Sequence, residues 1–300
     1  GQLKTYTDRN SNVHTLTYDV LGRLTSDAVT TLGTGVDGAV RRLEIGYDTQ
    51  GNASLFTSYD AASGGNVVNQ VQREFNGLGQ LTKDYQSHGG AVNTGTTPKV
   101  QYAYSEMASG ANHSRLTTMT YPNGRAVTHN YASGLDDAIG RLSSLSDTTG
   151  TLESYDYLGS STVVRRARVQ PGVDLTYIKQ SGEGNGDAGD QYAGLDRFGR
   201  AVDQRWIKVS GGTHTDRLQY GYDRNSNRLW RDNLVNAAFG ELYAYDNLNQ
   251  LTSMDRGTLN GTKTGLTCAA SRSQSWDFDA LGNWDSVTTD GSAQTRSHNK

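Results

Sequence analysis

Cysteine, proline and long hydrophobic runs are nearly missing from this chain of 300 residues. Cys268 is the only cysteine, so an internal disulfide framework is excluded. No apolar run approaches the roughly 20 residues that a membrane-spanning helix needs, and residues 1–20 lack the basic-then-apolar order of a signal peptide. Because the chain starts and stops in mid-pattern, we expect it to be a fragment of a larger protein.

An excess of charge of one sign is also missing. Lysine and arginine number 28 and the acidic residues 31, which gives a formal net charge of -3. The basic residues are scattered along the chain and form no stripe that could follow a phosphate backbone. Nucleic acid is therefore not an expected partner.

Helical packing is disfavoured by the composition. Only 34% of the residues are hydrophobic, whereas glycine accounts for 36 residues and tyrosine for 17. No helical stretch longer than about two turns shows convincing apolar spacing. Glycine-punctuated strands with aromatic faces fit this composition, so we predict an all-β fold.

A short motif recurs along most of the chain, and repeats are the strongest guide to its fold. Residues 18–24 read Tyr-Asp-Val-Leu-Gly-Arg-Leu, and related copies follow. Early copies are marked by aromatics at nearly constant spacing, at Tyr18, Tyr47, Phe75, Tyr102 and Tyr131. The residues that define the repeat are Tyr18, Asp19, Gly22, Leu24, Tyr47, Asp48, Gly51, Phe75, Gly79, Leu81, Asp196, Gly199, Tyr222, Asp223, Asn227, Leu229, Tyr245, Asp246, Leu251, Phe278, Asp279 and Gly282.

Each copy is typical of a β-hairpin. Residues 13–18 alternate apolar and polar side chains, as a half-buried strand does. The aspartate can accept hydrogen bonds from backbone amides two residues on, and glycine or asparagine can then take a positive φ. Residues 223–227 read Asp-Arg-Asn-Ser-Asn, which we interpret as such a turn with Asn227 in the glycine position. The alternative, an EF-hand calcium loop, lacks the glycine required at its sixth position.

The repeated Tyr-Asp-x-x-Gly-Arg/Asn-Leu pattern resembles the YD repeat of the RHS family, which is shared with the C subunits of bacterial toxin complexes and with teneurins. This resemblance implies a single array over residues 1–300, in which a spiral of β-hairpins forms a curved sheet or part of a hollow shell. Such shells often surround a C-terminal toxin that an aspartic protease motif releases. None of the three prolines follows an aspartate, so we expect neither that motif nor a toxin domain in this chain.

Signals for catalysis or cofactor binding are weak. Residues 184–189 match Gly-x-Gly-x-x-Gly, but no helix is predicted after them, so residues 180–191 are interpreted as a glycine-rich loop. Its acids, Glu183, Asp187 and Asp190, leave a loosely held Ca²⁺ as an alternative. The six histidines and the lone cysteine show no metal-ligand spacing. We therefore expect no catalytic residue, no metal and no cofactor.

Two functions remain in competition. The first is a structural segment of a secreted or cell-surface protein, whose β-shell or scaffold encloses or displays a C-terminal effector. Its partners would be neighbouring repeats and the enclosed effector, and tyrosines at a fixed place in each hairpin would stack those repeats. The alternative is an adhesin-like module that contacts carbohydrate or a partner cell surface through exposed aromatics.

Overall fold

The computed structural model describes residues 1–105 and 114–297, so His113 and His298 lie outside the described residues. Within these ranges, 22 strands belong to one antiparallel sheet. The described helices are short: α1 spans Leu135–Ala138, and the 3-10 helix η2 spans Ala237–Phe239. The predicted all-β class, built from antiparallel hairpins, is confirmed. The chain divides into two compact units, one of residues 1–130 and 145–150 and the other of residues 131–144 and 151–300.

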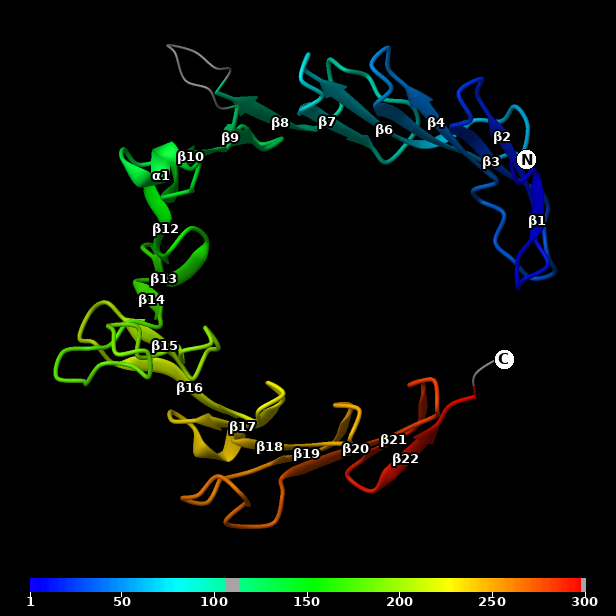
Figure 1. Ribbon diagram of the computed structural model, residues 1–300. Coiled ribbons are helices and arrows are strands. Elements are labelled where there is room, and N and C mark those ends of the chain that lie inside the picture. Colours follow the sequence, from blue (N-terminus) through cyan, green and yellow to red (C-terminus); the bar gives the residue numbers. More distant parts are fainter. Residues whose placement is uncertain (106–113, 298–300) are drawn as a thin grey trace. The chain divides into compact units, whose positions relative to one another are not determined.

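The first unit is an uninterrupted meander in which each strand pairs with the next (Figure 1, blue to green). Its strands are β1 (Thr5–Thr7), β2 (Val13–Tyr18), β3 (Leu24–Thr31), β4 (Arg42–Tyr47), β5 (Ala53–Tyr59), β6 (Val67–Phe75), β7 (Leu81–Ser87), β8 (Lys99–Tyr104), β9 (Leu116–Thr120) and β10 (Ala126–Asn130). Strand β11 (Ser144–Asp147) follows α1 in the chain.

The second unit repeats this arrangement, and its strands again pair in sequence order. They are β12 (Gly150–Leu158), β13 (Thr162–Arg168), β14 (Val173–Thr176), β15 (Asp203–Lys208), β16 (His214–Tyr222), β17 (Arg228–Asn233), β18 (Glu241–Tyr245), β19 (Leu251–Arg256), β20 (Arg272–Phe278), β21 (Trp284–Thr289) and β22 (Ser292–Thr295). Residues 180–191 contain no strand, as the sequence predicts for a loop.

The motif hairpins share one irregularity of register. The pairing shifts just before the aromatic residue, between Thr17 and Tyr18 and again between Gly221 and Tyr222. The same shift precedes Tyr47, Phe75, Tyr104, Tyr245 and Phe278. A bulge of this kind re-aims the side chains next to a turn. It also corrects one sequence assignment, because Tyr104 and not Tyr102 holds the motif position in its hairpin.

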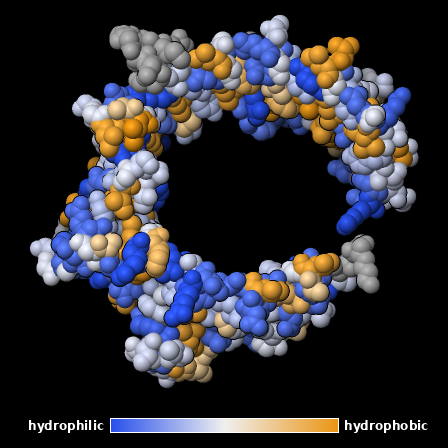
Figure 2. Space-filling model, in the orientation of Figure 1, coloured by the Kyte–Doolittle hydropathy of each residue, from blue (hydrophilic) through white to orange (hydrophobic). Residues whose placement is uncertain are grey.

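The hydrophobic core is thin, because a sheet of this kind buries few side chains completely. Tyr85 and Val164 are the largest side chains that are fully buried in the described part of the chain. Most motif aromatics are only half-buried, including Tyr18 and Tyr222. The face drawn in Figure 2 accordingly mixes hydrophilic and hydrophobic patches. Hydrogen bonds between hairpins therefore have a large share in holding the array together.

Candidate structural site: the repeat turn and its links

The acidic residue of each motif organises its turn. In the first full copy, Oδ1 of Asp19 accepts the backbone N–H groups of Leu21 and Arg23, each at 2.9 Å. Its other oxygen, Oδ2, accepts Nε of Arg23 at 2.7 Å. One carboxylate thus satisfies two backbone donors and fixes the side chain four residues on. We call this arrangement the aspartate clamp.

The aspartate clamp recurs throughout the described chain. Oδ1 of Asp8, Asp48, Asp196, Asp223, Asp246 and Asp279 accepts the same two backbone N–H groups. Asn76 supplies the acceptor in the hairpin of Phe75, again through Oδ1. Neutral asparagine therefore serves the same geometry, which shows that the acceptor oxygen is the common requirement.

The turn position three residues after the clamp aspartate requires a left-handed backbone. Gly22, Gly51, Gly79, Gly199 and Gly282 hold it, with φ between 74° and 91°. Here the structure corrects the alignment of residues 223–227. Ser226, with φ of 69°, takes the glycine position, while Asn227 is the clamped side chain that corresponds to Arg23. The partner of Tyr222 is corrected in the same way. Arg228 and not Leu229 pairs with Tyr222, because the left-handed position is residue 226 and not residue 227.

Tyrosine hydroxyls join most of the motif hairpins to the preceding one. The hydroxyl of Tyr47 donates to the carbonyl oxygen of Leu24 at 2.9 Å, and that of Tyr222 donates to Ala201 at 2.8 Å. Equivalent bonds run from Tyr18 to Leu3, Tyr104 to Leu81, Tyr157 to Leu142 and Tyr245 to Arg228. The motif tyrosine is therefore a link between repeats as well as a packing residue.

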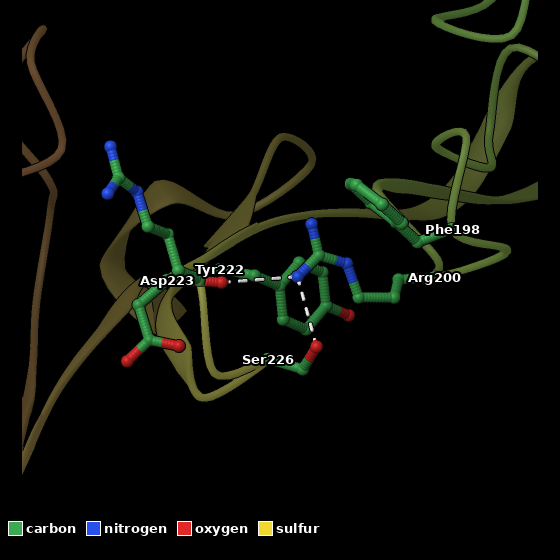
Figure 3. Close-up of a pocket in the computed structure, with 6 residues that line it drawn as sticks. Phe198, Arg200, Tyr222, Asp223 and Ser226 are labelled. Carbon is green, nitrogen blue, oxygen red and sulfur yellow. Dashed lines mark hydrogen bonds between the residues drawn. The ribbon is translucent and has the colours of Figure 1, made fainter.

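The clamped side chain also reaches the next turn. The Arg23 guanidinium stacks over the Tyr47 ring at 4.1 Å, and the Arg200 guanidinium stacks over Tyr222 at 4.8 Å. Figure 3 shows Arg200 between the two turns, bonded to the Asp223 carbonyl and the Ser226 hydroxyl. Where asparagine holds this position, Asn227 donates to Asn249 of the following turn at 2.8 Å. Neighbouring turns are thereby linked along one edge of the sheet.

These hydrogen bonds lower the pKa of several clamp carboxyls, as Asp19 and Asp48 show. The Arg23 backbone amide holds the pKa of Asp19 below its usual value, and the Asn52 side chain does the same for Asp48. Outside the clamps, hydrogen bonds from the Thr149 hydroxyl and amide, with Arg125, lower the pKa of Asp147 to about 2. Carboxyls of this kind stabilise the fold only while they are ionised.

Acid should therefore weaken the array. Since the folded pKa values are depressed, this stability is complete above the unfolded aspartate value of about 4 and is lost as pH falls through the folded values. We expect the melting temperature to drop steeply below about pH 4. The double variant Asp19→Asn, Asp48→Asn keeps the acceptor oxygens but cannot titrate there, so its melting temperature should fall less steeply. Parallel melting curves against pH for the two proteins would contradict this role.

The residues considered for chemistry do not come together. Within residues 1–105 and 114–297, no group of three His, Cys, Asp or Glu side chains is placed to hold a metal ion. Cys268 is exposed. Two acids considered for calcium face arginines instead, with Glu183 at 2.7 Å from Arg205 and Asp187 at 2.7 Å from Arg197. No helix among the described residues is long and apolar enough to cross a membrane.

A buried charge network in the second unit was missed by the sequence analysis. The Asp203 carboxylate accepts hydrogen bonds from Arg205, Arg217 and Gln219. Arg205, whose side chain is 3% exposed, also pairs with Glu183, so the network ties the loop of residues 180–191 to β15. Along β15, every second residue from Asp203 to Ile207 is buried although two of them are charged, so the hydrophobic pattern of the chain contained no signal for this network.

Comparisons with known proteins bear on the fold. No protein-family model and no curated protein sequence matches the chain. Among solved structures, it is similar to the Photorhabdus luminescens Tc holotoxin pore containing TccC3, at 14% identity over 96% of this chain, with a TM-score of 0.61. The crystal structures of TcdB2–TccC3–TEV and TcdB2–TccC3 match 98% and 96% of this chain at 13% and 14% identity, both with a TM-score of 0.55.

The similarity shows a shared fold, and it covers only a small part of the chains of those proteins. This chain spans 14% of the holotoxin chain and 16% of each crystallised chain. The match covers 96% of this chain, and the strand ladder, the aspartate clamps and the tyrosine links recur along most of its length. The chain therefore has the fold of the RHS-type YD-repeat region of the toxin-complex proteins.

Proposed function

We propose that this chain is a wall segment of a secreted or cell-surface RHS/YD-repeat protein, in which it forms part of a β-shell or scaffold that encloses or displays a C-terminal effector. The observation that carries the proposal is the repeated link between hairpins. Each clamp fixes a turn, and the motif tyrosine hydroxyls and several clamped side chains join a turn to a neighbour. Such nearest-neighbour links let a repeat array form an extended wall.

The proposed role is containment or display without chemistry of its own. The clamp carboxylates are engaged by backbone and side-chain donors, and an acid or base catalyst needs a group that can exchange a proton with substrate. Its partners are then the neighbouring repeats and the effector. An extracellular or cell-surface location follows from the proposed shell.

Limited proteolysis of the natural protein that contains this chain tests the proposal. Under native conditions we expect the wall to shield an effector segment, which should survive protease and remain associated with this sequence. Denaturation before protease should make both segments equally sensitive, because the shield is then gone. An effector segment that is cut at the same rate in the native and the denatured protein would overturn enclosure. A native protein with no protected segment at all would favour a scaffold for display.

A second candidate function, the adhesin-like module, is favoured by one surface feature. The groove in Figure 3 is lined by Phe198, a residue that is 74% exposed. An aromatic ring that is exposed to solvent beside arginines is a surface that favours the binding of a sugar.

A further inference from the structure

A groove separates two consecutive repeat turns of the second unit, residues 196–200 and 223–227. Its volume is about 530 Å³, within the range of small-ligand pockets. Its lining consists of Phe198, Arg200, Tyr222, Asp223, Arg224 and Ser226. All six belong to the two turns or to the motif tyrosine beside them, so the groove is a product of the repeat geometry.

The base of the groove is held rigidly. Nε of Arg200 is 2.7 Å from the Asp196 carboxylate, and its Nη1 donates to the Asp223 carbonyl and the Ser226 hydroxyl. The guanidinium also lies 5.2 Å from the Phe198 ring centroid and 4.8 Å from that of Tyr222 (Figure 3). A ligand that binds here would meet an arrangement already ordered by the clamps, which lowers the entropic cost of binding.

Several recognition groups in the groove remain available. Phe198 presents an exposed ring, and the Arg224 side chain is exposed without a hydrogen bond or ion pair to any described residue. Nη2 of Arg200 likewise makes no hydrogen bond in the described chain and is not among its buried polar atoms. The groove thus combines an aromatic face with two guanidinium groups that can still donate.

We propose that this groove binds a sugar that carries a carboxylate, and the proposal rests on the second candidate function. A carboxylate takes charge-assisted hydrogen bonds from guanidinium groups, here those of Arg224 and Arg200. The apolar face of the sugar ring packs on Phe198, and the Ser226 hydroxyl is placed for a ring hydroxyl. We expect a ligand with a single negative charge. The carboxylates of Asp196 and Asp223 lie in the same two turns and would repel a more highly charged anion.

No other repeat turn of the described chain offers this combination. The residue after the clamp acid or after Asn76 is uncharged in five of them, at Val20, Thr49, Gly77, Asn247 and Ala280. Arg197 holds the same position as Arg224, but its guanidinium pairs with Asp187. Residues 8–12 repeat the sequence of residues 223–227, and Arg9 is exposed there, but residues 1–7 contain neither a phenylalanine nor an arginine that could correspond to Phe198 and Arg200.

Titration of the 300-residue chain with sialyllactose and with digalacturonate tests the proposal, and lactose serves as the neutral probe. Isothermal calorimetry should detect saturable binding of an acidic probe and none of lactose. We expect Arg224→Ala and Phe198→Ala each to weaken that binding by about tenfold or more. The matched control is Arg9→Ala, which removes the same residue type from the same pentapeptide and should leave binding unchanged.

Each possible result of this titration either supports the proposed carbohydrate site or contradicts it. Both test side chains are exposed, so unchanged thermal unfolding of each variant will show that the fold is intact. Failure of both acidic probes to bind, or equal weakening by Arg9→Ala, would overturn the assignment. Equal binding of sulfated lactose would mean that the groove recognises anions in general and not a carboxylate in particular. None of these results depends on an enclosed effector, so failure here is distinguishable from failure of the proposed shell.

Discussion

Replacing Asp203 with alanine is expected to destabilise the second unit by about 3 kcal/mol, because it leaves the buried Arg205 and the half-buried Arg217 without their common partner. Asp203 is 6% exposed and accepts hydrogen bonds from Arg205, Arg217 and Gln219. Glu183 still faces Arg205 in the variant, so the lower end of the range for a broken buried pair is appropriate. The shift of the urea midpoint in far-ultraviolet circular dichroism measures the loss.

The matched control for this prediction is Asp156→Ala. Asp156 also pairs with an arginine, Arg165, at 3.2 Å, but its side chain is 53% exposed. An exposed pair of this kind contributes between about 0 and 1 kcal/mol, since water screens both charges. We expect a large shift of the midpoint for Asp203→Ala and a small one for Asp156→Ala. Equal shifts would mean that the buried network adds no more than a surface ion pair.

The part of the structure that could be predicted is the part that the repeat motif determines locally. A motif with an aspartate, a left-handed residue and a flanking aromatic specifies a hairpin by itself, because the hydrogen bonds of the aspartate lie within five residues. Asp19 and Gly22 illustrate this, since the clamp closes onto Arg23 and the positive φ falls on the glycine. Strand type and hairpin order followed from the same signal.

Errors arose where two residue types can exchange roles. Asn227 was placed in the glycine position because asparagine tolerates positive φ, as Asn249 in fact does. In residues 223–227, however, the asparagine amide serves the clamp, and Ser226 takes the left-handed position. The two alignments contain the same asparagine and differ only in the hydrogen bonds that its side chain makes. The local sequence alone therefore did not distinguish one alignment from the other.

Contacts between hairpins were beyond the reach of a single sequence. The Glu183–Arg205 pair joins residues 22 positions apart, and the groove beside Phe198 exists only once two turns lie next to each other. The tyrosine hydroxyl bond is a partial exception. A tyrosine at a fixed place in most hairpins indicated a link between repeats, but phenylalanine at positions 75 and 278 concealed the fact that the hydroxyl makes the link.

Removing those hydroxyls together should weaken the array by about 4 kcal/mol, at about 1 kcal/mol for each lost hydrogen bond. The proposed variant changes Tyr47, Tyr104, Tyr222 and Tyr245 to phenylalanine. Their hydroxyls donate to carbonyl oxygens of the preceding hairpins at 2.8 to 3.0 Å. The losses should add because the four hydroxyls donate to four different carbonyl groups, and because stability in a repeat array is a sum of neighbour terms.

A second quadruple variant provides the control for this prediction. Tyr59, Tyr102, Tyr121 and Tyr192 are changed to phenylalanine, since their hydroxyls donate no hydrogen bond to another described residue. The rings remain in both variants, and Phe75 shows that a ring alone is compatible with the motif turn. Urea unfolding should therefore separate the two proteins, with the control close to the native chain. A control that loses as much stability as the test variant would show that the hydroxyls act through solvation and not through links between hairpins.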